Sequence, residues 1–155
     1  MSDLSQIIAA PRLARPTSDL TPYRVSFQNP WNERVVSHLL RRTVIGPTAE
    51  EIGAALNSSL DNVVDGLLAE ETTPDPPAEW ALRNPIRRPL NEEDRQTERE
   101  QVNELRDWWA ELIVNQRLSI RERMVLFWHD HFATQAVDVR RPQYMYIQNA
   151  LFREH

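Results

Sequence analysis

The sequence predicts an all-α protein, and three observations support this fold class. Apolar residues recur three and four positions apart along most of the chain, which is the spacing of one helix face. Thr48 with Glu51, and Ser119 with Glu122, match the capping-box signature of a helix N-terminus. No segment shows the clean alternation of apolar and polar residues that is typical of a strand. We therefore expect an irregular multi-helix bundle with a proline-rich loop and an extended N-terminal arm.

Composition limits the classes of protein to which the chain can belong. With 155 residues it is long enough for one domain with a buried core. Its net charge of −5 argues against a nucleic-acid binder, which needs a basic face. The absence of cysteine excludes disulfides and thiolate metal sites. All 18 basic residues are arginine, which a GC-rich bacterial genome explains more simply than selection for anion binding by guanidinium groups.

The sequence shows no feature of a secreted or membrane-spanning protein. Its N-terminus lacks a basic region followed by an apolar run, so no secretory signal is indicated. No stretch approaches the roughly 20 apolar residues that span a bilayer. We expect a cytoplasmic protein without a membrane span, and export by another route remains open.

Prolines divide the chain into an arm, a helical domain and an internal loop. Four prolines before residue 31 recur too closely for a long helix, so residues 1–31 are expected to form an extended N-terminal arm. The helical domain then covers residues 32–155. Within it, the proline-rich segment 72–90 is expected to be a loop that Trp80 anchors to the core.

Three short helices are expected at the start of the domain, within residues 32–46, 48–59 and 58–71. Asn32 is a suitable N-cap for the first of them. Gly46, followed by a proline, ends that helix. Together the three helices are expected to form one small helical unit.

A long helix is expected to begin near Asn91, where acidic residues crowd the first turn and suit the helix dipole. Its first part is polar on all sides. These turns should therefore project into solvent or contact a partner that is absent from this chain. Its second part carries an apolar stripe, which consists of Val102, Leu105, Trp109, Leu112 and Ile113.

The last two helices, within residues 119–134 and 142–155, each carry an apolar stripe that we expect to face the core. The first stripe consists of Ile120, Met124, Phe127, Trp128 and His131. The second consists of Tyr144, Met145, Ile147, Leu151 and Phe152. No helix-ending signal follows the second helix, so we expect the chain to be the N-terminal fragment of a longer protein.

Three stretches carry a family resemblance. They are SHLLRRTVIGPTAEEIGAAL at residues 37–56, RERMVLFWHDHFAT at residues 121–134 and QNALFREH at residues 148–155. In content, order and spacing they resemble the bacterial domain-of-unknown-function family 1800. The resemblance implies longer proteins that continue into a carboxylate-rich helical segment, and it implies no specific activity.

The His129-Asp130-His131 segment is the most conspicuous candidate for chemistry. Helical residues two positions apart point about 200° away from each other, so the two histidines cannot share a metal on a regular helix. His131 lies on the apolar stripe and is expected to be a core histidine. His129 is the better candidate for a metal ligand or an acid–base group. Asp130 is either a solvated residue or a carboxylate that orients a histidine of another helix.

His38 is the third candidate ligand. A structural role in its helix is the simpler interpretation. If His38 and His129 lie close together, a site completed by carboxylates would suit zinc or manganese.

Two arginine pairs are candidates for anion binding. They consist of Arg41, Arg42, Arg140 and Arg141. Compensation of the helix dipole and surface ion pairs are the simpler explanation, and a site for phosphate or sulfate is the more specific alternative.

Two functions are therefore expected. The first is a helical scaffold or protein-interaction module within a larger protein, whose partner is the rest of its own chain or another protein. The second is part of a metal-dependent hydrolase that uses His129 or His131 as ligand or general base. Nucleic acid is not expected as a partner, and the formation of an oligomer stays open.

Overall fold

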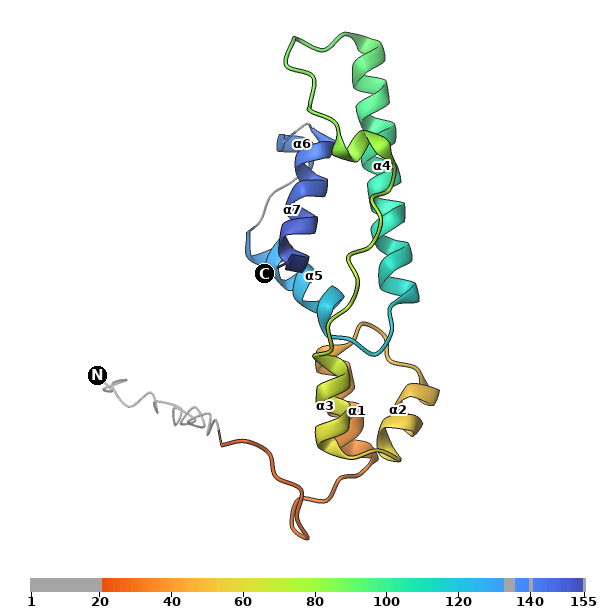
Figure 1. Ribbon diagram of the computed structural model, residues 1–155, viewed down its shortest axis with the longest axis vertical. Coiled ribbons are helices and arrows are strands. Elements are labelled where there is room, and N and C mark those ends of the chain that lie inside the picture. Colours follow the sequence, from red (N-terminus) through yellow and green to blue (C-terminus); the bar gives the residue numbers. More distant parts are fainter. Residues whose placement is uncertain (1–20, 133–135, 140, 155) are drawn as a thin grey trace, which may run out of the picture.

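The computed structural model describes residues 21–132, 136–139 and 141–154, with the backbone alone at residues 137 and 138. Within these ranges the chain forms helices joined by loops and no strand, so the predicted all-α fold is confirmed (Figure 1). Residues 1–20 of the predicted arm lie outside the described residues. Residues 21–30 are exposed and belong to no helix or strand.

Three short helices form the first unit of the fold, as the sequence predicts. They are α1 (Glu33–Thr43), α2 (Ala49–Leu56) and α3 (Leu60–Leu67). Asn32 caps α1 by accepting a hydrogen bond from the backbone N–H of Val35 at 3.2 Å. At α2 the predicted capping box between Thr48 and Glu51 is complete. Gly46 lies between these two helices with a φ of 68°, a conformation that favours glycine.

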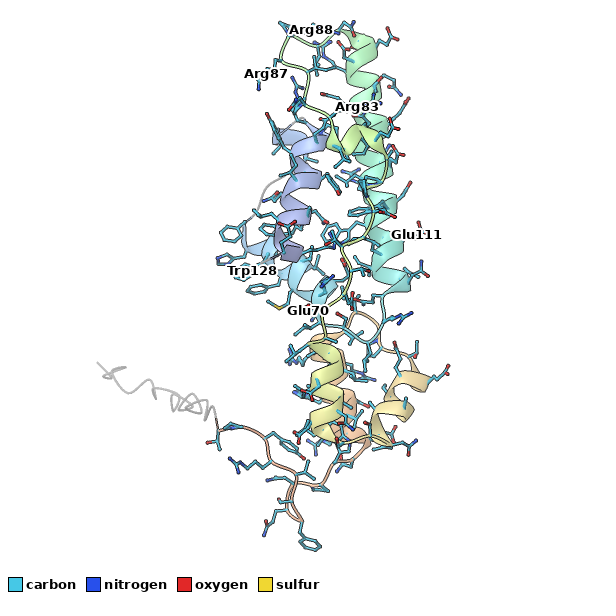
Figure 2. All side chains as sticks on the ribbon, in the orientation of Figure 1. Glu70, Arg83, Arg87, Arg88, Glu111 and Trp128 are labelled. Atoms are coloured by element: carbon cyan, nitrogen blue, oxygen red, sulfur yellow. The ribbon has the colours of Figure 1, made fainter. Side chains whose placement is uncertain are left out.

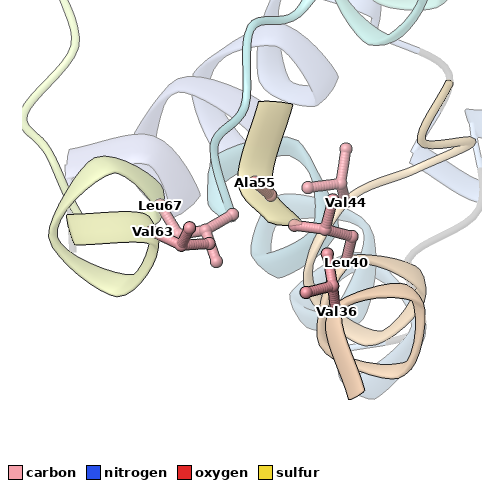
Figure 3. Packing of buried hydrophobic residues seen from close by; sticks show 6 residues of the cluster. All are labelled: Val36, Leu40, Val44, Ala55, Val63 and Leu67. Carbon is pink, nitrogen blue, oxygen red and sulfur yellow. The ribbon is translucent and has the colours of Figure 1, made fainter. Parts of the chain in front are cut away.

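The first unit has its own apolar core. Its buried members are Val36, Leu40, Val44, Ala55, Val63 and Leu67 (Figure 3). Leu118, which follows α4 in the chain, packs against this core. The backbone N–H of Ile120 also donates to the carbonyl of Leu67 at 3.1 Å. These contacts join the first unit to the helices that follow.

The second unit begins with the 3-10 helix η1 (Glu79–Leu82) and the long helix α4 (Glu92–Asn115). Trp80 is buried, and its indole N–H donates to the carboxylate of Glu104 at 2.7 Å, so the predicted anchoring of the loop is confirmed. At the start of α4, Asn91 and Asp94 form a capping box. None of the residues of α4 is fully buried, because the helix packs only on one side (Figure 1).

Three further helices complete the second unit. They are α5 (Arg121–His131), α6 (Ala136–Val139) and α7 (Pro142–Glu154). Helix α7 packs against α5, α6, α4 and η1. Its Tyr146 joins Trp80 and Ala81 in a second buried cluster, and it meets the ring of Trp108 edge to face at 5.7 Å.

Helices α5 and α7 are rotated relative to the sequence prediction. On α5 the buried residues are Glu122 and Val125, whereas Phe127 of the predicted core stripe is 52% exposed. On α7 the buried residues after Pro142 are Gln143, Tyr146 and Asn149. The predicted stripe members Tyr144, Ile147 and Leu151 are exposed. The prediction that both stripes face the core was therefore wrong, because polar groups that bond to each other occupy the inner faces.

The predicted capping box at Ser119 and Glu122 is also wrong. The residue before α5 is Ile120, which makes no side-chain cap, and the Ser119 hydroxyl accepts from the backbone N–H of Arg121 at 3.1 Å. Glu122 points inward instead, to Trp109 and Arg153. A charge-assisted hydrogen bond to a guanidinium is stronger than the hydrogen bond to a neutral backbone N–H that a capping box would provide.

Candidate functional site

A buried ion pair joins α5 to α7. The guanidinium of Arg153 donates to both carboxylate oxygens of Glu122, with nitrogen–oxygen distances of 2.7 to 3.1 Å. The two side chains are only 2% and 8% exposed. The indole N–H of Trp109, on α4, donates to the same carboxylate at 2.8 Å. One carboxylate therefore fixes three helices relative to one another.

The ion pair continues into an amide and an imidazole. Arg153 also donates to the side-chain oxygen of Asn149, one turn earlier on α7. This contact directs the amide NH₂ group of Asn149 toward Nε2 of His129, at 3.2 Å. Since the amide nitrogen can only donate, Nε2 must accept, and the proton of a neutral His129 lies on Nδ1.

The surroundings of His129 favour its neutral form. Its ring is half-buried, 4.7 Å from the ring of Trp109 and 4.9 Å from that of Phe152, which it meets edge on. Burial lowers the pKa of His129, and the positive charge of Arg153 lowers this pKa further. A neutral imidazole can bind a proton or a metal, but the amide of Asn149 already occupies Nε2.

A cavity of about 370 Å³ lies beside His129, between α4, α5 and α7. Its walls are mainly apolar and include Leu105, Leu126 and Met145. Asn149 and Asp130 also contribute to the lining. The arrangement therefore places one neutral imidazole on the wall of an apolar cavity.

The structure separates the two histidines of the His-Asp-His segment, as the helical geometry predicts. His131 is exposed, and its ring stacks on Phe127 at 6.0 Å. The prediction of a core histidine at His131 was therefore wrong, because the stripe on which it lies faces outward. Asp130 is exposed as well.

His38 does not join the other two histidines. It is exposed on α1, in the first unit. Among the described residues, no three histidine or carboxylate side chains are arranged to hold a metal ion. A zinc or manganese site that uses His38, His129 and His131 stays a prediction.

The arginines predicted to bind anions are also divided. Arg41 and Arg42 are exposed in the last turn of α1, where cations suit the helix dipole. Arg141, just before α7, pairs with both carboxylate oxygens of Glu98 at 3.1 Å. Arg140 lies outside the described residues. Figure 1 shows α1 and the start of α7 in different units, so the described members form no single site.

Sequence reasoning missed the inner polar residues. A signal for them was present in the spacing, because Glu122, Val125 and His129 recur at intervals of three and four. On α7 the inner residues Tyr146, Asn149 and Arg153 follow the same rule. Each helix therefore has two self-consistent faces, and the sequence pattern alone favours the more apolar one as the inner face.

Residues 38–155 match the model of one protein family, which carries the description Protein of unknown function (DUF1800). The chain belongs to the DUF1800 family. The matched range contains all residues of the polar network, from Trp109 to Arg153. The comparison with curated proteins found no match, and neither did the comparison with solved structures. Within the described ranges, none of the helices has the length and apolarity that crossing a membrane requires.

Proposed function

We propose that this member of the DUF1800 family is a helical interaction module, and that α5 and α7 form its docking surface. The surface, here called the outer face, has seven members: Met124, Phe127, Trp128, Phe132, Tyr144, Ile147 and Leu151. Six of them are between 36% and 54% exposed, and Trp128 is half-buried. Figure 2 shows Trp128 on the side of α5 that faces away from α4. This outward apolar face is the observation that carries the proposal.

The outer face is costly for an isolated domain to expose. Burial of apolar surface contributes roughly 25 cal/mol per Å², and its members are large side chains. Single exposed apolar residues are common on soluble proteins, but neighbouring ones on two packed helices are typical of interaction sites. A partner that covers the outer face would recover this free energy.

The expected occupant is an apolar face of one or more protein helices. Helices α5 and α7 pack against each other, and a third helix can pack its ridges of side chains onto such a pair. None of the seven members of the outer face carries a formal charge. His131, which is not a member, lies at its edge. This chemistry suits an apolar protein surface better than a nucleic acid. Either the rest of a longer polypeptide or a second protein can supply such helices.

The buried network supports this function by fixing the two helices. Because Glu122 and Arg153 lie on the inner faces of α5 and α7, their pairing keeps the opposite faces outward. A buried ion pair of this kind contributes more to a defined arrangement than to stability, compared with apolar residues of the same volume. The network would thus give the docking surface its shape.

Thiol labelling in the cell tests the proposal. The natural chain has no cysteine, so a single introduced thiol gives an unambiguous signal. Ile147→Cys places the thiol on the outer face. Glu111→Cys is the control, because Glu111 is exposed on α4 and Figure 2 shows it away from α5 and α7. We expect a cell-permeable maleimide in the native host to label the control and to spare Ile147→Cys until the protein is denatured.

The purified chain supplies the second half of the test. In a dilute solution of the purified chain, the thiol of Ile147→Cys should react with the maleimide as fast as that of Glu111→Cys. Protection that grows with the concentration of the purified chain would identify a second copy as the occupant. Equal labelling of both variants in the cell would show that the outer face has no partner, and would overturn the proposal.

A further inference from the structure

A second cavity lies at the other end of α7, and the polar network does not use it. Its volume is about 780 Å³, within the usual range for small-ligand sites. The loop before α4, the first half of α4 and the start of α7 line it, and it opens to solvent. Leu90, Val102 and Pro142 give it an apolar wall.

The charged groups of this cavity are mostly positive. Its lining contains the guanidinium groups of Arg95, Arg99, Arg106 and Arg141, and the single carboxylate of Glu98. This is unusual for its position, because residues 49–111 contain 16 acidic residues and only 6 arginines. An excess of guanidinium groups around an apolar hollow raises the local concentration of anions.

Several carboxylates among the described residues pair with these arginines. Glu98 binds Arg141 through both of its oxygens at 3.1 Å. Glu92 is shared between Arg95 at 3.2 Å and Arg99 at 3.1 Å, and both of these guanidinium groups are more than half exposed. Among the described residues, Asp94 also lies close enough to interact with Arg141. The pairs that Glu92 makes with Arg95 and Arg99 are exposed, and exposed pairs are weak enough to rearrange around a ligand.

Arg106 is the arginine with the greatest freedom to bind a ligand. Its recorded contact is with the side-chain oxygen of Asn103, at a long 3.4 Å, and no carboxylate in the described ranges pairs with it. It lies between the two cavities and lines both of them. A guanidinium group at this position can meet an anionic head group with two parallel hydrogen bonds.

We infer that this cavity binds an amphipathic anion, with a carboxylate or phosphate head on Arg106 and an apolar tail along Val102, Leu90 and Pro142. The inference is independent of the proposed docking function, because none of the seven members of the outer face lines the cavity. The pair of Arg141 with Glu98 holds the wall of the cavity at the start of α7. The head group then pairs with Arg106, which none of the carboxylates among the described residues does.

Calorimetric titration of the purified chain with three eight-carbon probes tests the inference. The probes are octanoate, octyl phosphate and neutral octanol, each below its aggregation limit at pH 7.5. We expect at least one anion to bind with a stoichiometry of one, at least about tenfold more tightly than octanol, as one charge-assisted contact allows. The tighter of the two anions identifies the head group. Equal binding of octanol, or no binding of either anion, would overturn the inference.

Two variants locate the site. Arg106→Gln should weaken binding of the anion about tenfold, since it removes one charged contact. Arg83→Gln is the control, because Arg83 is exposed, pairs with Glu79 and does not line the cavity. Ile147→Glu, on the outer face, should leave the affinity for the anion unchanged. A failure of the anion-binding inference is therefore distinguishable from a failure of the docking proposal. Equal affinities for Arg106→Gln and Arg83→Gln would show that the cavity is not the site.

Discussion

Glu122 on α5 and Arg153 on α7 form a bidentate ion pair that is almost fully buried, with its shortest contact at 2.7 Å. The residues are 31 positions apart, and the indole of Trp109 on α4 completes the contact. The pair places polar groups where the sequence pattern predicts a core. It therefore determines which faces of the two helices remain available to a partner.

Removal of one member of this pair should be strongly destabilising. Arg153→Ala leaves the carboxylate of Glu122 buried without its counter-ion, and we expect the free energy of unfolding to fall by about 3–5 kcal/mol. Urea denaturation followed by tryptophan fluorescence measures this change. Arg83→Ala, which removes the exposed pair with Glu79, is the control and should cost less than about 1 kcal/mol. Similar losses for the two variants would show that the Glu122–Arg153 pair is not buried in solution.

Asn149 should matter because it bridges Arg153 and His129. Asn149→Leu removes the acceptor for Arg153 and the donor for Nε2 of His129. Nε2 of His129 then lacks its donor, and Arg153 loses one acceptor while it keeps Glu122. We therefore expect a loss of about 1–3 kcal/mol in a denaturant titration. Gln148→Leu, at the neighbouring position, is the comparison and should cost less, because Gln148 is half-buried whereas Asn149 is 2% exposed. The bridging role would be refuted by an Asn149→Leu protein as stable as the natural chain.

Stability should fall at mildly acidic pH because of His129. Its pKa is lowered in the folded state, so the folded chain binds fewer protons than the unfolded chain does. The full stability is present above the ordinary histidine pKa of about 6.5, and it is lost as the pH falls below this value and through the lowered pKa. Unfolding midpoints measured in urea from pH 8 to pH 5 should show the decline.

Two histidine variants test the assignment of this pH dependence. His129→Gln should flatten the decline, because it removes the buried titrating group. His131→Gln should leave the decline in place, since His131 is exposed. If the decline disappears with His131→Gln instead, the pH dependence comes from the exposed His131, and the role of His129 is contradicted.

Neighbouring substitutions on α7 should have opposite consequences. Ile147→Glu lies on the outer face, so we expect a change in stability of at most about 0.5 kcal/mol and a higher solubility. Tyr146→Glu buries a charge beside Trp80 and Ala81, and should cost several times more. Thermal unfolding and the solubility limit of each variant check both statements. If Ile147→Glu proved the more damaging change, α7 would have the orientation that the sequence pattern predicts.

The predicted metal site can be examined through elemental analysis. A metal at Nε2 of His129 requires the amide of Asn149 to turn away, so Asn149→Ala should increase any zinc or manganese content. His129→Ala should abolish it. If the metal content of the purified chain is the same in both variants and in the natural protein, His129 is not a ligand.

Local signals in the sequence predicted the helices well. Thr48 with Glu51 forms the expected capping box, and Asn32 and Asn91 cap α1 and α4. These features depend on residues within one turn of each other, which a sequence displays directly. The anchoring of Trp80 was also predictable, because a tryptophan in a proline-rich loop has few other places to bury its ring.

The orientation of α5 and α7 could not be predicted in the same way. Burial was assigned to the apolar stripes, whereas the contact between Glu122 and Arg153 depends on two helices that meet only in three dimensions. The same long-range pair removed Glu122 from the capping box with Ser119. The residue pattern of a single helix shows which residues share a face. Which face lies inside depends on how several helices pack together.

Thiol accessibility at two adjacent positions of α7 is the most direct test of the outward apolar face. Gln143 is buried and Tyr144 is 53% exposed, so Gln143→Cys and Tyr144→Cys place one thiol on each side of the helix. In the purified chain we expect a maleimide to label Tyr144→Cys rapidly and Gln143→Cys only slowly, until denaturant is added. Rapid labelling of Gln143→Cys with protection of Tyr144→Cys would contradict the orientation of α7, and with it the proposed docking surface.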